Sequence, residues 1–330
     1  MMYMENTWQN HLAMKKYLSI AVILLTIGST AFAQTVVKKS FTGIKRIKIS
    51  TSSGDCEIKK SSGNTVELEL VHTLDERDFT PRIEQSGERL DIGEEFHGHN
   101  YNGSVKWKLS IPDGLRVNFT TGSGDLAVTD VNIDLNAGTG SGDLEFASLK
   151  GSVDANTGSG NVDVSNFNGE AKVNTGSGDM DIRDSEGDID LNCGSGDIKV
   201  YQVKAAFSVN TGSGNVTGEK VTINGSSRFN TGSGRARIAL AATPKFDLAL
   251  NSGSGNAELN FAGNDIVGEV VMKASKRNGS ISAPFEFDKT EEVNYGNGDN
   301  NVTIVKTAQR GKGTNRIMIS TGSGDAVLRK

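Results

Sequence analysis

The stretch Thr121-Gly-Ser-Gly-Asp125 decides the fold of this chain, because close copies of it return at a fixed interval. The next five copies begin at Thr139, Thr157, Thr175, Cys193 and Thr211, and the step between them is the same each time. The step then lengthens slightly for the copy at Thr231, and slightly again for the copy at Ser252. A fixed period of this size is typical of a stacked repeat architecture.

Further copies of the motif lie outside this run. One precedes it at residues 51–55, and weaker ones follow at residues 295–299 and 321–325. The register weakens after about residue 265, although the segments there keep a strand-like pattern. We therefore expect the repeats to continue to the end of the chain in a less regular form.

Apolar residues occupy the same positions in successive repeats, with Asp, Glu, Lys, Asn and Arg between them. Four such columns are Leu126, Leu144, Val162, Met180, Ile198 and Val216; Val128, Phe146, Val164, Ile182 and Val200; Leu135, Val153, Ala171, Ile189 and Phe207; and Ala137, Ala155, Val173, Leu191 and Val209. This alternation predicts two short strands per repeat with their apolar side chains inward. Stacking would bury the columns in one continuous core. The sequence therefore predicts an all-β protein, a parallel β-solenoid (β-helix) of about 18–21 residues per coil.

Residues 34–115 also alternate, but without the repeat. Ile44, Ile47 and Ile49 are interleaved with basic residues, and the segments 66–70 and 105–109 alternate in the same way. An open solenoid end exposes apolar surface and unpaired backbone, so such an end needs a cover. We expect a strand-rich N-terminal cap over residues 34–115 and a solenoid repeat domain over residues 116–330, irregular after about residue 265.

The segment 1–33 has the organisation of a secretory signal peptide. Lys15 and Lys16 precede an apolar run over residues 18–27, and Ala31-Phe32-Ala33 forms a small-x-small cleavage site. The apolar run is too short to span a membrane. Met14 is an alternative start. We expect an exported protein in the periplasm, at the cell surface or outside the cell, with no membrane span in the mature chain.

The composition excludes several classes of function. The net charge of -5 gives no general attraction to nucleic acid. The two cysteines, Cys56 and Cys193, are too far apart in the sequence for a recognisable disulfide framework or metal-binding spacing. No cofactor is expected from these features.

Two sets of residues are candidate metal ligands. Asp125, Asp143, Asp179 and Asp197 share one repeat position, as in calcium-binding β-rolls. Asn161, Asn215, Asn256 and Arg235 interrupt this row, so capping of turns by Asx side chains is the favoured interpretation and calcium is the alternative. The second set is Glu94, Glu95, His97 and His99, which a solvated loop explains as well as a metal site does.

Catalysis has little support in the sequence. No histidine follows His99, so a serine nucleophile in a glycine motif would have to draw its base from His72, His97 or His99. The coils between residues 121 and 216 also carry no insertions from which a catalytic cleft could be built. We therefore expect no enzymatic activity and no catalytic residues.

The segment from Lys108 to Asp125, KLSIPDGLRVNFTTGSGD, and the Gly-Ser-Gly-Asp array after it resemble the bacterial putative adhesin family of β-strand-repeat proteins. That family is similar in turn to the head GIN domain of autotransporter adhesins. The resemblance covers most of the chain from about Phe41 to Lys330. It implies an exported β-solenoid at the cell envelope and supplies no catalytic or binding residues.

The outward positions of the coils form a long polar surface, which includes Asp154, Asn156, Asp163, Lys172, Asn174, Asp181, Arg183, Asp190 and Asn192. Many weak contacts on such a surface can bind an extended polymer or a partner protein. We expect a non-enzymatic adhesin or scaffold whose partners are surface glycans or proteins. An envelope sensor or polysaccharide-binding module is the alternative, and a polysaccharide-active enzyme is less favoured.

Overall fold

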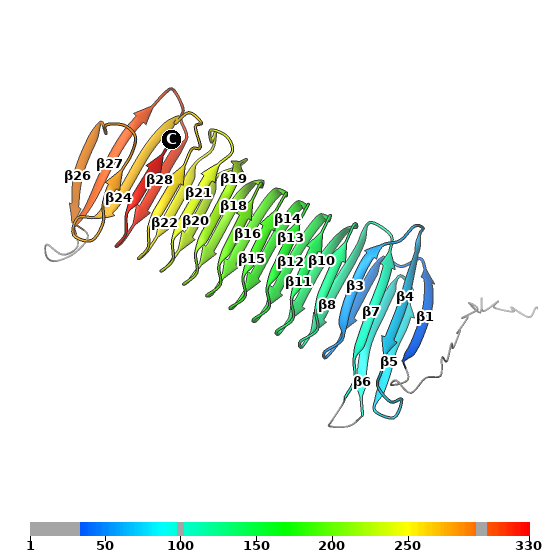
Figure 1. The fold of residues 1–330 in the computed structure, drawn as a ribbon. Coiled ribbons are helices and arrows are strands. Elements are labelled where there is room, and N and C mark those ends of the chain that lie inside the picture. Colours follow the sequence, from blue (N-terminus) through cyan, green and yellow to red (C-terminus); the bar gives the residue numbers. More distant parts are fainter. Residues whose placement is uncertain (1–33, 98–101, 295–301) are drawn as a thin grey trace, which may run out of the picture.

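The computed structural model describes residues 34–97, 102–294 and 302–330. These residues form strands and turns and contain no helix, so none of them belongs to a helix that could cross a membrane. The strands stack along one axis into an elongated body (Figure 1). The all-β solenoid predicted from the repeat is confirmed.

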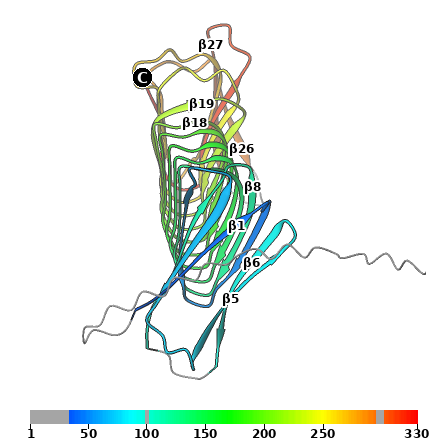
Figure 2. The ribbon, with the colours of Figure 1, turned by 90° about the vertical axis from the view of Figure 1, so that its right-hand side faces the viewer.

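Each regular coil runs along one sheet, passes through the Gly-Ser-Gly turn and returns along a second sheet. Viewed from the end, successive coils follow the same flattened outline (Figure 2). Sheet 1 of the central stack contains β8 (Leu115–Thr121), β10 (Asn132–Thr139), β12 (Lys150–Thr157), β14 (Asn168–Thr175), β16 (Glu186–Cys193), β18 (Lys204–Thr211), β20 (Ser227–Thr231) and β22 (Leu248–Ser252). Sheet 2 contains β9 (Leu126–Thr129), β11 (Leu144–Ala147), β13 (Val162–Ser165), β15 (Met180–Arg183), β17 (Ile198–Tyr201), β19 (Val216–Ile223), β21 (Ala236–Leu240) and β23 (Ala257–Asn260).

Neighbouring strands of both sheets are parallel and in repeat register. Thr157 on β12 lies opposite Thr139 on β10 and Thr175 on β14, and Leu144 on β11 lies opposite Val162 on β13. All four predicted apolar columns are buried between the sheets. Burial of one aliphatic side chain contributes about 1.5–3 kcal/mol, so the stack is stabilised collectively by its columns.

The glycine turns stack so closely that a side chain has no room. A Cβ atom on Gly160 would lie 1.9 Å from the carbonyl oxygen of Gly142 in the previous coil, and on Gly178 it would lie 1.9 Å from that of Gly160. Real Cβ atoms do not approach backbone oxygens at this distance. Close approach of successive backbones therefore explains why glycine recurs at this position.

The second turn of each coil uses a different device. One residue in it has a left-handed backbone conformation, with φ between 51° and 57° at Asp130, Ser148, Asn166, Asp184, Gln202 and Lys220. We call this line of outward side chains the polar corner. Left-handed residues other than glycine are uncommon, and Asn and Asp tolerate the conformation best. The two corners therefore differ, because left-handed polar residues form this one and closely stacked glycines form the other.

Residues within the segment 34–115 form a coil that stacks directly against the one at Thr121. β2 (Arg46–Ser50) pairs with β8 and β3 (Asp55–Lys60) pairs with β9, so the motif at residues 51–55 lies directly against the one at residues 121–125. The chain between these two coils, together with the strand that precedes β2, forms the N-terminal end of the stack. That end contains β1 (Thr35–Thr42), β4 (Thr65–His72), β5 (Phe79–Ser86), β6 (Arg89–Phe96) and β7 (Val105–Ile111). There β6 pairs in parallel with β2 and β7 pairs in parallel with β3, and the antiparallel pairs β1–β4, β4–β7 and β5–β6 complete the end.

The C-terminal end repeats this arrangement in reverse. β28 (Arg316–Thr321) lies between β22 and β24 (Gly268–Ser275), and β29 (Ala326–Arg329) lies between β23 and β25 (Ile281–Ser282). Figure 1 shows β28 in red between earlier strands. The weaker motif at residues 321–325 is therefore in register with the coil at Ser252, while the one at residues 295–299 lies outside the described residues.

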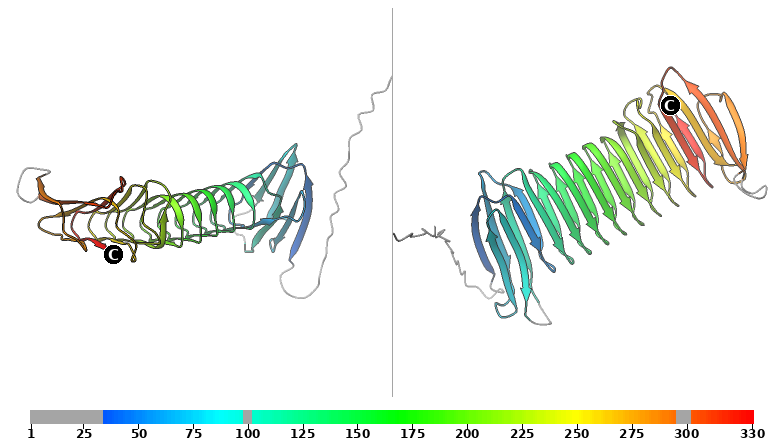
Figure 3. Two further views of the ribbon diagram at one scale, coloured as in Figure 1. Left: turned by 90° about the horizontal axis from the view of Figure 1, so that it is seen from above. Right: turned by 180° about the vertical axis from the view of Figure 1, so that it is seen from behind.

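Two antiparallel strands, β26 (Lys289–Asn294) and β27 (Val302–Arg310), extend sheet 1 beyond β24. Both ends of the body thus carry strands beyond the coils, as Figure 3 shows from behind. Phe285 and Phe287 pack against the end of the core. The Arg310 guanidinium carbon lies 4.2 Å from the Phe285 ring centroid, and Lys306 Nζ lies 5.3 Å from that of Phe287. This contact covers the apolar end with cationic side chains.

These pairings change how the cap and the repeat domain divide. The boundary expected at residue 115 runs through one continuous stack, because β2 and β3 precede it and still form a coil. The two neighbouring coils are joined by the hydrogen bond from the Asp125 N–H to Asp55 Oδ1, although these residues are far apart in the sequence. The period of the repeat follows the order of the chain and therefore does not predict this contact.

Candidate functional site

The threonine of the motif links each glycine turn to the one before it. Thr157 Oγ1 accepts a hydrogen bond from the Gly160 N–H at 3.0 Å and donates one to the Gly142 carbonyl at 3.2 Å. Cys193 replaces threonine in this line, and its Sγ makes the equivalent contacts with Gly196 N (2.9 Å) and Gly178 O (3.3 Å). Cys193 therefore has a structural role in the turn.

The Asp and Asn residues that end the motif form a second ladder. Asp125 Oδ1 accepts the backbone N–H of Asp143 at 2.8 Å, and Asp143 Oδ1 accepts that of Asn161 at 2.7 Å. The same contact continues through Asp179, Asp197 and Asn215 up to the N–H of Arg235. Each of these side chains thus satisfies a backbone donor in the next coil.

This ladder bears on the proposed calcium row. Asp125, Asp143, Asp179 and Asp197 do lie in one row, and each gives its Oδ1 atom to a backbone N–H. Among the described residues, no three His, Cys, Asp or Glu side chains converge as metal ligands. The turn-capping interpretation accounts for these contacts, and calcium binding stays a prediction.

Glu94, from the second candidate cluster, lies at the first glycine turn. Glu94 Oε2 accepts the Ser52 N–H at 2.8 Å, and Oε1 accepts the Trp107 Nε1–H at 2.9 Å. Oε1 also lies 2.1 Å from where a Cβ atom on Gly54 would be. This carboxylate therefore occupies the place that the backbone of a preceding glycine turn takes in the regular coils.

The rest of that cluster does not gather around Glu94 in the described residues. His97 Nε2 lies 3.0 Å from Thr80 Oγ1, which fits a hydrogen bond across β5 and β6. Glu95 is exposed, and His99 lies outside the described residues. A metal site that includes His99 stays a prediction.

The remaining groups with possible chemistry are buried. His72 is 3% exposed, its ring centroid lies 4.9 Å from that of Phe79, and burial lowers the pKa of its imidazole. Cys56 lies in the core beneath the first glycine turn, where burial raises the pKa of its thiol. A buried thiol with a raised pKa is a poor nucleophile.

Part of the outward polar surface bonds to itself. Asn192 Nδ2 donates to Asn174 Oδ1 at 3.1 Å, and Asn210 Nδ2 donates to Asn192 Oδ1 at 2.9 Å. This asparagine ladder contains Asn156, Asn174, Asn192, Asn210, Asn230 and Asn251. Several predicted contact residues therefore stabilise the stack.

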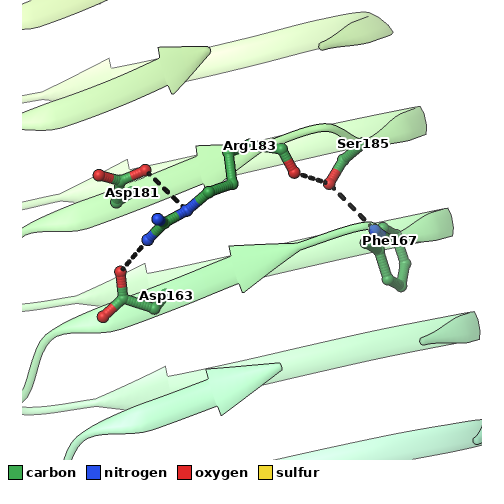
Figure 4. A network of polar contacts seen from close by, with 5 residues as sticks. All are labelled: Asp163, Phe167, Asp181, Arg183 and Ser185. Atoms are coloured by element: carbon green, nitrogen blue, oxygen red, sulfur yellow. Dashed lines mark hydrogen bonds and ion pairs between the residues drawn. The ribbon is translucent and has the colours of Figure 1, made fainter. Parts of the chain in front are cut away.

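Arg183 shows the same behaviour on sheet 2. Its guanidinium lies 3.3 Å from Asp163 Oδ1 and 3.7 Å from Asp181 Oδ1, as Figure 4 shows. Ser185, in the adjoining turn, donates to the Arg183 carbonyl at 2.7 Å and accepts the Phe167 N–H at 3.1 Å. These exposed ion pairs add little stability, but they order the surface between coils.

A groove follows the polar corner where the coils lengthen. Its volume is about 690 Å³, and a smaller hollow of about 190 Å³ adjoins it. The groove crosses five successive coils, since its lining includes Asp184, Gln202, Lys220, Leu240 and Ala262. We call it the corner groove. Beyond β21 and β23 the connections extend past the line of the regular corners (Figure 1).

The lining of the corner groove changes along its length from polar to apolar residues. The corner carries polar residues up to Lys220, whereas the next two coils carry Leu240, Ala241 and Ala262. Leu240 is buried and lines the groove. Asn264 closes this end, held by a 2.7 Å hydrogen bond from its Nδ2 to the Phe261 carbonyl.

Two lysines of the corner groove are held by neighbours. Lys204 Nζ lies 2.5 Å from Glu186 Oε1 in the previous coil. Lys220 Nζ donates to Tyr201 Oη at 2.7 Å and lies 4.9 Å from the centre of that ring. The hydrogen bond with Tyr201 raises the pKa of Lys220. Tyr201 itself is 39% exposed.

A larger hollow of about 880 Å³ lies at the N-terminal end. Three of its charged side chains pair with each other, since Glu69 forms ion pairs with Lys38 at 2.7 Å and with Lys108 at 3.3 Å. The bond with Lys38 is the main cause that lowers the pKa of Glu69. This charge network braces the antiparallel strands of the cap.

Neither the Glu94 contact nor the corner groove was expected from the sequence. Glu94 reaches Ser52 from a distant part of the chain, and no local pattern predicts such a pair. The lengthening of the repeat after Thr211 was the available signal for the groove, but it does not say on which side of the coil the extra residues lie.

The coils, ladders and capped ends define a parallel β-solenoid of the stacked-repeat class. Residues 44–282 match the model of the Toastrack DUF4097 family, and the chain belongs to that family. No curated protein matches the sequence.

Solved structures of similar proteins include a "putative adhesin" from Parabacteroides merdae ATCC 43184, at 14% identity and a TM-score of 0.42, which covers 90% of this chain and 96% of its own. A "putative lipid binding protein" from Parabacteroides distasonis ATCC 8503 has 16% identity and a TM-score of 0.42 over 89% of this chain and 96% of its own. A second "putative adhesin" from that organism has 14% identity and a TM-score of 0.33, with 90% and 97% covered.

Proposed function

We propose that this protein is exported and acts without catalysis at the cell surface or in the envelope, as an adhesin or scaffold. The observation that carries the proposal is the register of the stack. Outward side chains from successive parallel strands are held in straight rows, for example Asp154, Lys172 and Asp190 on sheet 1. Adjacent strands lie about 4.8 Å apart, so such rows offer contacts at a regular spacing.

Regular rows suit recognition of an extended partner. Each contact can be weak, because many of them act together when the partner is a polymer or an elongated protein. The ladders also keep the surface rigid before binding, which lowers the ordering cost of association. The family relationship and the names of the similar structures agree with a surface protein.

The favoured partners are glycans or proteins at a surface. The test is binding of the chain from Gln34 to Lys330 to arrays of glycans and extracellular matrix proteins, with and without calcium. Saturable binding to one class supports the adhesin function, and dependence on calcium would restore the Asp row as a metal site.

Absence of binding to either array at high micromolar concentration would overturn the adhesin function. The partner would then be sought within the envelope of the same cell, as the sensor or scaffold alternative requires. Export is tested separately, by fractionation of cells that express the full chain and by N-terminal sequencing of the product. A product that begins at Met1 or Met14 would contradict the predicted cleavage before Gln34.

A further inference from the structure

We propose that the corner groove binds a linear, neutral oligosaccharide, with Tyr201 as a stacking platform beside it. This inference rests on the proposed function and deepens it, since it names one site and one class of ligand. The groove interrupts the regular surface with a hollow, and an exposed aromatic side chain lies next to it.

The shape of the groove fits an extended chain. It crosses five coils, from Asp184 to Ala262. With about 4.8 Å between adjacent strands, this corresponds to roughly 19 Å along the solenoid axis. A short stretch of a linear sugar polymer can lie in such a groove with several rings in contact at once.

The polar groups that line the groove suit hydroxyl groups. The side chains of Asp184 and Gln202 are exposed and make no hydrogen bond with another described residue. Asn264 is fixed through its Nδ2 atom, which leaves its carbonyl oxygen as an acceptor. A carboxylate, an amide and an amide oxygen together can accept from and donate to the neighbouring hydroxyls of a sugar ring.

The charges favour a neutral ligand. Lys204 is paired with Glu186 at 2.5 Å, and Lys220 is held at the Tyr201 hydroxyl at 2.7 Å. Asp184 forms no ion pair with any residue that the structure describes, so its carboxylate remains on the groove wall. An anionic glycan would meet this carboxylate and would have to compete for lysines that already have partners.

Tyr201 provides the apolar contact. Its outward position at the end of the sheet 2 strand is filled by Thr129, Ala147, Ser165 and Arg183 in the four preceding coils. The bond from Lys220 fixes the hydroxyl end of the ring. An aromatic ring that is 39% exposed and held in place can pack against the C–H face of a sugar at a small entropy cost.

The experiment is isothermal titration of the full chain with neutral hexasaccharides, namely cellohexaose, maltohexaose, xylohexaose, mannohexaose and chitohexaose. Tyr201→Ala is expected to weaken binding roughly fivefold to tenfold, through loss of the stacking contact. Gln202→Ala is expected to weaken it roughly threefold to tenfold, through loss of a hydrogen bond.

The matched control is Asn166→Ala. Asn166 holds the same left-handed corner position as Gln202, with φ of 51° against 56°, but lies two coils away and does not line the groove. Asn tolerates this conformation better than Gln, so Asn166→Ala strains the backbone at least as much as Gln202→Ala. A loss of affinity in Gln202→Ala alone therefore belongs to the groove. Melting temperatures of the variants confirm that each is folded.

Binding of one hexasaccharide that Tyr201→Ala and Gln202→Ala weaken and Asn166→Ala leaves unchanged supports the proposal. Binding that all three variants leave unchanged would overturn the groove as the site while the adhesin function stands. No binding of any hexasaccharide at millimolar concentration would also overturn the groove proposal, and the array experiment would then decide the adhesin function independently.

Discussion

The glycine turns of the regular coils and those at the two ends of the stack obtain their hydrogen-bond and packing partners in different ways. In the middle, every glycine turn receives its hydrogen bonds from the turn before it, so one sequence motif serves each coil. At the first end no glycine turn among the described residues precedes the motif at residues 51–55, and the Glu94 carboxylate takes that place against Ser52 and Gly54. At the far end Gly279 and Ser280 stack on the last motif, and Ser280 N–H donates to Asp325 Oδ1 at 3.1 Å. A repeat can therefore supply its own partners everywhere except at its boundaries, where individual residues must do so.

The largest loss of stability is expected from a substitution in the repeated glycine turn itself. Gly160→Ala places a Cβ atom 1.9 Å from the Gly142 carbonyl oxygen, a backbone atom that cannot move alone. We expect a loss of about 3 kcal/mol or more in the free energy of unfolding, measured by urea denaturation followed by circular dichroism.

Its control is Gly138→Ala, also in a regular coil, where the nearest heavy atom to the new Cβ would be the Phe119 carbonyl oxygen at 4.0 Å. We expect this variant to equal the wild type or to be slightly more stable, because alanine restricts the unfolded chain. Equal losses in the two variants would contradict the close-approach explanation for glycine.

The next largest effect is expected at the first end. Glu94→Ala removes the acceptor for both the Ser52 N–H and the Trp107 indole, which should cost about 2 kcal/mol. Tryptophan fluorescence reports unfolding directly in a Trp8→Phe background, where Trp107 is the single tryptophan. Glu95→Ala on the same strand is the control, and a loss there as large as in Glu94→Ala would refute the end-cap role.

A pH effect should distinguish the N-terminal end from the middle. Burial lowers the pKa of His72 below its ordinary value, and its Nδ1 atom has no partner among the described residues. The unfolded state then binds a proton more readily than the folded state, so stability falls as the pH drops below about 6.5. The slope is at most about 1.4 kcal/mol per pH unit.

This prediction is checked by urea denaturation between pH 8 and pH 5, followed by the same Trp107 fluorescence. His72→Phe should flatten the dependence in that range, since it removes the titrating group and keeps an aromatic ring beside Phe79. If the stability of His72→Phe depends on pH as steeply as that of the wild type, the pH dependence belongs to other titratable groups.

The smallest effect is expected in the asparagine ladder. Asn192→Ala removes the hydrogen bonds to Asn174 and from Asn210, at 3.1 Å and 2.9 Å, and should lower stability by about 1 kcal/mol. Asn168→Ala, at an exposed position outside the ladder, should stay within about 0.5 kcal/mol of the wild type. If both variants match the wild type, the ladder orders the surface without stabilising the stack.

The sequence predicted the middle of the molecule better than its ends for a physical reason. Columns such as Leu126, Leu144 and Val162 recur because each coil buries the next, so the period alone determines the fold. The ends depend on pairs that are far apart in the chain, such as Asp55 with Asp125 or Asn256 with Asp325. The order of residues shows that these outer motifs exist but does not say which coil each of them lies against.

The candidate sites were only partly predictable for the same reason. The Asp row was visible as a row, and its turn-capping contacts follow from the short Asx side chains at a fixed position. The corner groove depends on where two lengthened coils place their extra residues, together with the change from Lys220 to Ala262 at the corner. That is a property of packing, which the sequence shows only as a change of period.

Because the chain returns into the stack at both ends, the number of coils does not affect how the two ends are closed. The segments that close the body leave from one coil and come back to form its neighbour, so they are independent of the number of coils between them. Gain or loss of one regular coil between Thr121 and Thr211 would move the two ends apart or together by about 4.8 Å and leave both closures unchanged. The length of the body can therefore change in steps of one coil while the segments that close its two ends stay the same.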